Sequence, residues 1–373
     1  MSQRRSERRE TTSVATFTVA RRAYLDADGH PRCSLPEWAQ DARQLRALLQ
    51  SMLLARCFDA RAVALQRTGG LGTYASGLGQ EAVPVGVASA MRPEDVLLPS
   101  YREPIAQHLR GVALEEVLRY WGGDERGSAY AHGGTDFPPC IPVGSQLPHA
   151  AGVAFALKRR GAGGAAVTFI GDGGTSKGDF YEAINLAGVW QLPLVVVINN
   201  NQWAISVARQ AQSAAQTLAQ KALAAGIDGI QVDGNDVIAV RQVTSEALTA
   251  AEAGRATVIE AVTYRLGDHT TADDASRYRA AQEVEAAQAQ EPIKRLQQYL
   301  RTCEALDGAQ QATMEQDAKA TVEAAVDAYR IGPERRPESL FSHLYADSPV
   351  ALDRQRRDFL RQNDAGPDGL DDD

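Results

Sequence analysis

The chain has 373 residues, of which 44% are hydrophobic and 23% are charged, so it can bury the core of one large domain or two modest ones. Its net charge of −8 gives no electrostatic reason to expect a nucleic acid or an anionic membrane as partner. No apolar run is long enough to span a membrane, no secretory signal is evident, and the four cysteines follow no disulfide or metal-binding spacing. We therefore expect a reducing compartment, the cytoplasm.

The first 35 residues show no hydrophobic periodicity and predict an N-terminal arm that is ordered only where a partner holds it. Its Arg-rich start is weakly similar to a mitochondrial presequence, but the acidic residues within it favour a solvated tail. Apolar residues at helical spacing then predict a helix over residues 36–66. Another helix is predicted to begin in the segment GLGQEA, residues 77–82.

A short strand is predicted at residues 95–99, and Tyr101 and Arg102 follow its carboxyl end. An arginine at such an edge can bind a phosphate through two hydrogen bonds, and a tyrosine hydroxyl can donate another. From these residues alone, a surface salt bridge is the simpler interpretation of Arg102.

An irregular loop is predicted at residues 128–142, because this stretch is rich in Gly and Pro. It contains His132, and a single histidine in a loop is more often only solvated than functional. Val143 follows the loop, and a helix with several small residues is then predicted at 147–159.

The clearest pattern lies between residues 166 and 203. The run 167–170 is apolar, β-branched and aromatic, and the run 194–198 is continuously apolar, as buried strands are. Apolar residues at helical spacing lie between them. A strand, a helix and a strand form a βαβ unit, whose two strands are parallel. Their carboxyl ends therefore meet at one edge of the sheet, where open α/β sheets bind ligands.

Oxygen-bearing side chains follow both strands of this unit. Asp172, within Gly171-Asp172-Gly173-Gly174, follows the first strand, and three asparagines ending at Asn201 follow the second. Such oxygens suit Mg²⁺, which takes its other ligands from water and phosphate. Backbone N–H groups from Gly173 onward open the predicted helix and can receive phosphate oxygens. Together they predict a magnesium-diphosphate site, although either piece alone is more often a plain turn or loop.

Other phosphate-binding motifs fit less well. No G-x-x-x-x-G-K-[ST] is present, which excludes a Walker A loop. A dinucleotide site is weaker, because Ser176 replaces the third glycine and Asn199, not an acid, ends the second strand.

Two further strands are predicted at 229–233 and 257–262, with a helix between them that Asn235 or Asp236 caps. A long polar loop follows the second of these strands. It contains His269, the strongest histidine candidate, because the loop starts at the same edge as Asp172. Helices are expected from there to about residue 329, followed by a polar tail that is predicted to be disordered. Small residues on the helix after Gly178 (Ala183, Ala187 and Gly188) suit either core packing or close subunit packing.

The pair GDG and NN, with Asn201 twenty-nine positions after Asp172, is similar to the thiamin diphosphate motif. Longer stretches resemble the α subunit of E1 in the 2-oxo acid dehydrogenase complexes: GDGGTSKGDFYEAINLAG, INNNQWAIS, GIQVDGND and YRLGDHTTADDASRYR. We expect a three-layer α/β fold with a mainly parallel sheet. The expected parts are an arm (1–35), a thiamin diphosphate domain with flanking helices (36–330) and a tail (331–373).

This resemblance implies thiamin diphosphate-dependent oxidative decarboxylation of a 2-oxo acid, followed by acyl transfer to the lipoyl group of E2. The implied Mg²⁺ ligands are the side chains of Asp172 and Asn201 and the Trp203 carbonyl. The implied cofactor-binding residues are Tyr101, Arg102, Val143 (a wedge between the cofactor's rings), Gly171, Asp172, Gly173, Gly174, Asn201 and His269. The implied catalytic residues are His269 and His132.

A β subunit is also implied. The glutamate that activates thiamin in this family lies on a domain that this chain lacks, and the family supplies it from a β subunit in an α₂β₂ tetramer. Pyruvate and branched-chain 2-oxo acids both remain candidate substrates, with GDGGTSKGDFYE leaning towards the bacterial pyruvate type. Phosphorylation at Thr270, beside His269, stays open. The alternatives in other classes are a dinucleotide-dependent oxidoreductase and a non-catalytic scaffold.

Overall fold

The computed structural model describes residues 12–132, 134–332, 337–342 and 344–364. The chain divides into two compact units, residues 1–326 and 327–373, and the domain boundaries expected above stay predictions. Among the described residues, no helix combines the length and the apolarity that crossing a membrane requires.

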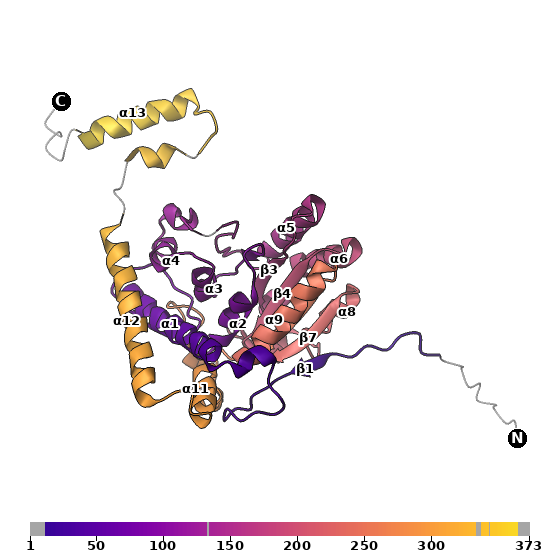
Figure 1. Cartoon of the computed structure of the whole chain (residues 1–373). Helices are drawn as coiled ribbons and strands as arrows, with labels where there is room; N and C mark the ends of the chain where they lie inside the picture. The colour runs from indigo at the N-terminus through magenta and orange to yellow at the C-terminus, as the bar shows by residue number, and fades with distance from the viewer. Residues whose placement is uncertain (1–11, 133, 333–336, 343, 365–373) are drawn as a thin grey trace, which may run out of the picture. The chain divides into compact units, whose positions relative to one another are not determined.

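A single parallel sheet organises the first unit (Figure 1). Its described strands lie in the order β1-β7-β8-β4-β3-β2, and every neighbouring pair is parallel. Their bounds are β1 Ala20–Arg22, β2 Val96–Leu98, β3 Ala166–Gly171, β4 Leu194–Asn200, β7 Asp228–Asp233 and β8 Thr257–Val262. The prediction of a mainly parallel sheet is confirmed.

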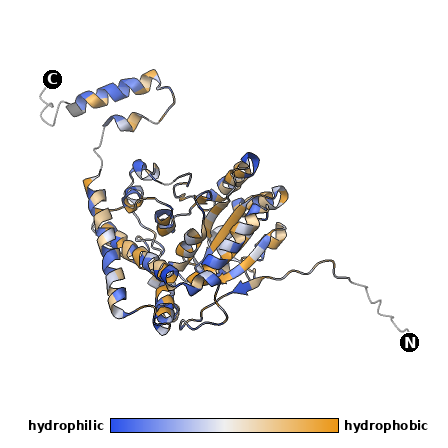
Figure 2. Cartoon of the chain, in the orientation of Figure 1, coloured by the Kyte–Doolittle hydropathy of each residue, from blue (hydrophilic) through white to orange (hydrophobic). Residues whose placement is uncertain are grey.

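Helices cover both faces of this sheet and make the three layers. Because successive side chains of a strand point to opposite faces, Val195 and Val197 of β4 join one core cluster and Val196 and Ile198 join the other. The first cluster includes α1 (Ala42–Arg67), α2 (Ala82–Ala90) and α9 (Val237–Glu252); the second includes α5 (Gln146–Arg160) and α6 (Gly178–Trp190). Figure 2 shows the central strands as mostly hydrophobic, as expected of strands buried on both faces.

The remaining elements of the described chain are short or lie outside the sheet. They are η1 Glu37–Gln40, α3 Pro104–Leu109, α4 Leu114–Trp121, η2 Glu125–Ser128, η3 Gly173–Ser176, β5 Trp203–Ala204, β6 Val207–Ala208, α7 Arg209–Gln212, α8 Lys221–Ala224, η4 Ala275–Arg277, α10 Ala281–Gln288, α11 Pro292–Thr302, α12 Gly308–Ile331, η5 Pro337–Phe341 and α13 Val350–Asp364. The predicted helix over 36–66 is in fact two, because Asp41 separates η1 from α1 and caps α1 by accepting from the Arg43 N–H at 2.9 Å.

The N-terminal segment is better ordered than its sequence predicts. Strand β1 pairs with β7 at the edge of the sheet, and the next residues, Tyr24 and Leu25, are buried. The expectation that this arm is ordered only on a partner is therefore wrong for residues 20–25, because the same chain holds them. Residues 1–11 lie outside the described residues.

The predicted disorder of the tail is also wrong in part. Described residues of the second unit form η5 and α13, and the rings of Phe341 and Phe359 lie 5.8 Å apart.

The small residues on α6 lie inside the first unit. Ala183 and Ala187 are buried in the core, and a Cβ at Gly188 would collide with the Ala225 carbonyl. These small residues therefore serve packing within the chain.

Candidate functional site

A cavity of about 300 Å³ opens at the carboxyl edge of the sheet. It is lined by residues that follow β2, β3, β4 and β8, four strands that are neighbours in the sheet although their sequences lie far apart. Its lining includes every predicted site residue except His132: Tyr101, Arg102, Val143, Gly171, Asp172, Gly173, Gly174, Asn201, Trp203 and His269.

Asp172 lies directly after β3 and is only 1% exposed. Its Oδ2 accepts no hydrogen bond from any described residue, and burial raises the pKa of this carboxyl to about 6. A buried acceptor without a donor is unfavourable unless a ligand supplies the missing partner. The side chain is therefore well suited to a cation or a donor from outside the chain.

The turn after Asp172 differs from the predicted helix start. Gly173–Ser176 is the 3₁₀ turn η3, and α6 begins only at Gly178. A Cβ added at Gly173 would lie 2.6 Å from the Ala204 Cβ, and one at Gly174 would lie 2.6 Å from the Ile170 Cγ1. Glycine is thus required here by the close approach of neighbouring residues, and it leaves the backbone facing the cavity.

The three asparagines after β4 have different surroundings. Asn199 lines the cavity with a buried Oδ1 that has no partner in the described chain. Asn200 points elsewhere and donates to Glu260 Oε1 at 2.7 Å. Asn201 donates from Nδ2 to Gln80 Oε1 at 2.9 Å, and its Oδ1 accepts the Trp203 N–H at 3.2 Å. Gln80, which sequence reasoning gave no role, therefore fixes the orientation of the Asn201 amide.

Arg102 and His269 contact each other across the cavity. The guanidinium of Arg102 donates to the Ser76 carbonyl at 2.6 Å and to the His269 carbonyl at 2.8 Å, and it lies 2.8 Å from the His269 Nδ1. No described residue forms a salt bridge with Arg102, so the surface salt bridge considered above is wrong. Tyr101 packs edge-on to His269, with ring centroids 6.5 Å apart.

His269 is held as a neutral imidazole. Its Nδ1 faces two guanidinium donors, those of Arg102 and Arg265, so this nitrogen must accept and the ring proton sits on Nε2. Burial, followed by the charges of Arg102 and Arg265, lowers the pKa of His269 to about 4. The ring can therefore offer an N–H donor at neutral pH.

Arg265 links the His269 loop to the segment after β4. It is fully buried and donates to the carbonyls of Trp203 at 3.2 Å and Ile205 at 2.7 Å, and to the Tyr278 hydroxyl at 2.9 Å. No local pattern in the sequence predicts these contacts.

Val143 and His132 have contrasting positions. Val143 lines the cavity beside Gly174 and is 42% exposed, so its side chain is accessible to a ligand. His132 is exposed and does not line this cavity. The structure therefore does not bring His132 together with the other predicted residues.

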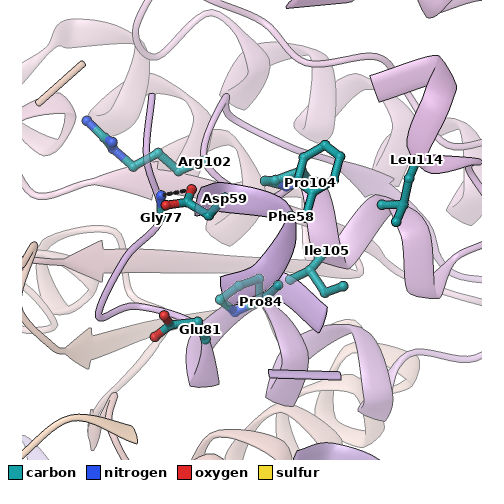
Figure 3. A pocket seen from close by; sticks show the side chains of 10 residues that line it. Phe58, Asp59, Gly77, Glu81, Pro84, Arg102, Pro104, Ile105 and Leu114 are labelled. Carbon is teal, nitrogen blue, oxygen red and sulfur yellow. Dashed lines mark hydrogen bonds between the residues drawn. The ribbon is translucent and has the colours of Figure 1, made fainter. Parts of the chain in front are cut away.

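A second cavity lies behind Arg102 and is mostly apolar (Figure 3). Its volume of about 20 Å³ has room for about one water molecule. Asp59 at its wall accepts from the Tyr74 hydroxyl at 3.1 Å and the Gly77 N–H at 2.8 Å. Figure 3 shows the Arg102 guanidinium pointing away from the apolar side chains, and the small volume leaves no room for a substrate.

The oxygens in the larger cavity fit a hard divalent cation. Asp172 supplies a carboxylate, Asn201 a carboxamide oxygen and Trp203 a carbonyl, all suited to Mg²⁺. No group of three His, Cys, Asp or Glu side chains that could hold a metal occurs in the described ranges. A cation here would therefore take its remaining ligands from water and phosphate.

These features describe an α/β fold with a cavity at the carboxyl edge of its sheet, lined by oxygen-bearing side chains and a glycine turn. Residues 49–338 match the family described as dehydrogenase E1 component. The chain is 41% identical over 314 residues to the pyruvate dehydrogenase E1 component subunit alpha of Staphylococcus aureus, covering 84% of this chain and 85% of the relative. The same subunit of Staphylococcus epidermidis is 40% identical over equal shares.

The chain therefore belongs to the E1 dehydrogenase family, the thiamin diphosphate-dependent enzymes that oxidatively decarboxylate 2-oxo acids. The resemblance to the E1 α subunit is confirmed, and a dinucleotide-dependent oxidoreductase is not favoured.

Proposed function

We propose that this chain is the α subunit of an E1 that acts on pyruvate, with Mg²⁺ and thiamin diphosphate bound in the cavity beside Asp172. The observation that carries this proposal is the buried, unpaired carboxylate oxygen of Asp172, in a cavity that also contains all the other predicted cofactor residues. Pyruvate is favoured over a branched-chain acid because both relatives named above are pyruvate dehydrogenase subunits.

The proposed cation ligands are Asp172, Asn201 and the Trp203 carbonyl. Gln80 supports this assignment, because it accepts from the Asn201 Nδ2 and so fixes the orientation of the amide. The Asn201 Oδ1 accepts the Trp203 N–H and has a second lone pair that can face a cation. A carbonyl oxygen has two lone pairs, so Trp203 can retain its bond from Arg265 and still face a cation.

The proposed diphosphate site combines the glycine turn with Tyr101, Arg102 and His269. Arg102 is buried and forms no salt bridge with a described residue, although the charges of Asp59 and Glu103 act on it. An anionic diphosphate would add a counter-charge in direct contact with the guanidinium. The neutral His269 would donate from Nε2, and Val143 would separate the cofactor's rings. The thiazolium ring of the bound cofactor accepts the electrons that are released when carbon dioxide leaves. We assign no role to His132.

A β subunit is proposed to complete the site in an α₂β₂ tetramer, with the lipoyl domain of E2 as acyl acceptor. Exposed apolar side chains that line the cavity support a covering partner: Val143 is 42% exposed, Val207 45% and Ile205 56%. Ile205 also has a positive φ of 56°, which is unusual for a β-branched residue and marks a strained turn at this rim.

The test is reconstitution of the chain with its β subunit. We expect calorimetry to show thiamin diphosphate binding that requires Mg²⁺, and kcat/KM to be higher for pyruvate than for 3-methyl-2-oxobutanoate. The chain alone should not turn over either acid. Full turnover by the chain alone would contradict the role of the β subunit, and binding that is indifferent to Mg²⁺ would contradict the metal site.

A further inference from the structure

Lys221, in the short helix α8, is a buried lysine that lies behind the glycine turn. It is 6% exposed, and its Nζ donates to both the carbonyl and the Oγ1 of Thr175, each at 2.9 Å. Thr175 belongs to η3, and its hydroxyl donates in turn to the Asp172 carbonyl at 2.7 Å. The ammonium therefore holds the back of the turn whose front lines the cavity.

This ammonium is not in direct contact with a counter-charge in the described part of the chain. No described carboxylate forms a salt bridge with it. Glu260 is the acid whose charge acts on Lys221, but its oxygens accept from Asn200 and from the N–H groups of Leu218 and Ala219. Glu182 lines the same surface cavity as Lys221 and forms no ion pair with it.

The surroundings of Lys221 disfavour its charge in the ligand-free chain. Burial lowers the pKa of Lys221, and the positive charge of Arg209 lowers it further. The rings of Phe180 and Tyr181, with centroids 5.9 and 5.3 Å from Nζ, compensate only in part. A buried cation of this kind is unfavourable unless an anion is placed near it.

We propose that Lys221 is a positioning residue for the diphosphate and that the diphosphate is its missing counter-charge. It fixes η3 from behind through Thr175 and adds positive charge to the anion site in front. This inference rests on the proposed cofactor site and adds to it a residue outside the cavity lining.

The proposal separates two effects of removing the charge. Lys221→Met keeps the apolar stem and deletes the ammonium, so the ligand-free protein should be as stable as wild type or more stable. Affinity for the diphosphate should fall, because the attraction between the Lys221 ammonium and the diphosphate exists only in the bound state. A purely structural lysine would behave in the opposite way: stability would fall, and the remaining folded protein would bind normally.

The experiment compares thiamin diphosphate and thiamin monophosphate binding to the Mg²⁺-loaded complex with the β subunit. For Lys221→Met we expect about tenfold weaker binding of the diphosphate, a smaller loss for the monophosphate, and no fall in the urea midpoint of the ligand-free complex. Lys221→Arg should restore most of the affinity. The matched control is Lys158→Met, which also removes an ammonium that donates to carbonyls (those of Trp190 and Gln191), but at the C-terminal end of α6.

Two results would overturn the inference while leaving the cofactor site intact. One is wild-type diphosphate affinity in Lys221→Met, and the other is an equal loss for both ligands together with a lower urea midpoint. Failure of the wild-type complex to bind thiamin diphosphate would instead show that the proposed cofactor site is wrong, and the inference would be rejected with it.

Discussion

Two buried aspartates at the same edge of the sheet are almost equally hidden and are held very differently. Asp172, after β3, and Asp236, after β7, are each 1% exposed. Asp236 accepts from four backbone N–H groups, those of Tyr24, Leu25, Ile238 and Ala239, at 2.6 to 3.1 Å. Asp172 leaves one oxygen with no partner in the described chain.

This difference is the ground on which we propose a structural role for Asp236 and a functional role for Asp172. Burial raises the pKa of both carboxyls, so neither burial nor pKa alone separates them. What separates them is whether the chain supplies the hydrogen bonds. Asp236 joins residues 24–25 to the start of α9, whereas Asp172 has an oxygen available for a ligand.

Replacing the structural acid should give the largest effect on stability. Asp236→Ala removes the cap of α9 and leaves the N–H groups of Tyr24 and Leu25 without their acceptor. We expect the free energy of unfolding to fall by about 4 kcal/mol, from roughly 1 kcal/mol for the cap and 1–3 kcal/mol for each unpaired donor. Urea denaturation measures the loss, and hydrogen exchange should show faster exchange at residues 24–25.

The control for this change is Asp228→Ala, at an exposed position of β7, the strand that precedes Asp236, which should alter stability by less than about 0.5 kcal/mol. A small loss for Asp236→Ala, close to that of the control, would remove the contrast between the two acids.

Replacing the functional acid should leave stability intact and weaken cofactor binding. Asp172→Asn keeps the shape but removes the charge that a divalent cation needs. We expect Mg²⁺-dependent thiamin diphosphate binding to weaken by about 100-fold. Loss of a residue that only hydrogen-bonds to a metal ligand can already weaken metal binding by this factor. Calorimetry on the complex with the β subunit measures this, with Asp179→Asn, at a partly exposed position in the first turn of α6, as control. Unchanged affinity in Asp172→Asn would place the cation elsewhere.

A smaller effect is expected on how the stability of the ligand-free protein depends on pH. Because the folded pKa of Asp172, about 6, is above its usual value of 3.8, its protonated form is favoured in the fold. The stability that this provides is complete below pH about 4 and is lost as pH rises through about 6. Ligand-free wild type should therefore lose about 2 kcal/mol relative to Asp172→Asn across that range.

Denaturation of both proteins at several pH values measures this difference. Mg²⁺ with thiamin diphosphate should reverse it, since the bound cation favours the ionised carboxylate. A stability difference that stays constant from pH 4 to 7 would mean that Asp172 is not held as described.

Much of the fold was predictable because its central signals are local. The apolar runs of β3 and β4 identified buried parallel strands, and their ends located Asp172 and Asn201. Strand β1 was not predictable, since Arg21 and Arg22 give it no apolar pattern and its order comes from pairing with β7 more than 200 residues later. The helix α13 was missed for a similar reason, because its polar sequence was interpreted as disorder.

The contacts that orient the site residues could not be predicted from the sequence either. Gln80 is 121 residues from Asn201, and Lys221 is 46 residues from Thr175. Neither pair has a spacing that a motif could contain. The ligand-type residues follow strands and can be inferred from the βαβ rule, but the residues that orient them are brought close only by the completed fold.

The position of β8 has a consequence for synthesis on the ribosome. This strand lies between β4 and β7, yet it is made after both. Until residue 262 has left the ribosome, β4 has an unpaired edge rich in valine, and such edges readily pair with other chains. A nascent chain that stalls before β8 is therefore expected to need a chaperone, and one that is released there is expected to aggregate.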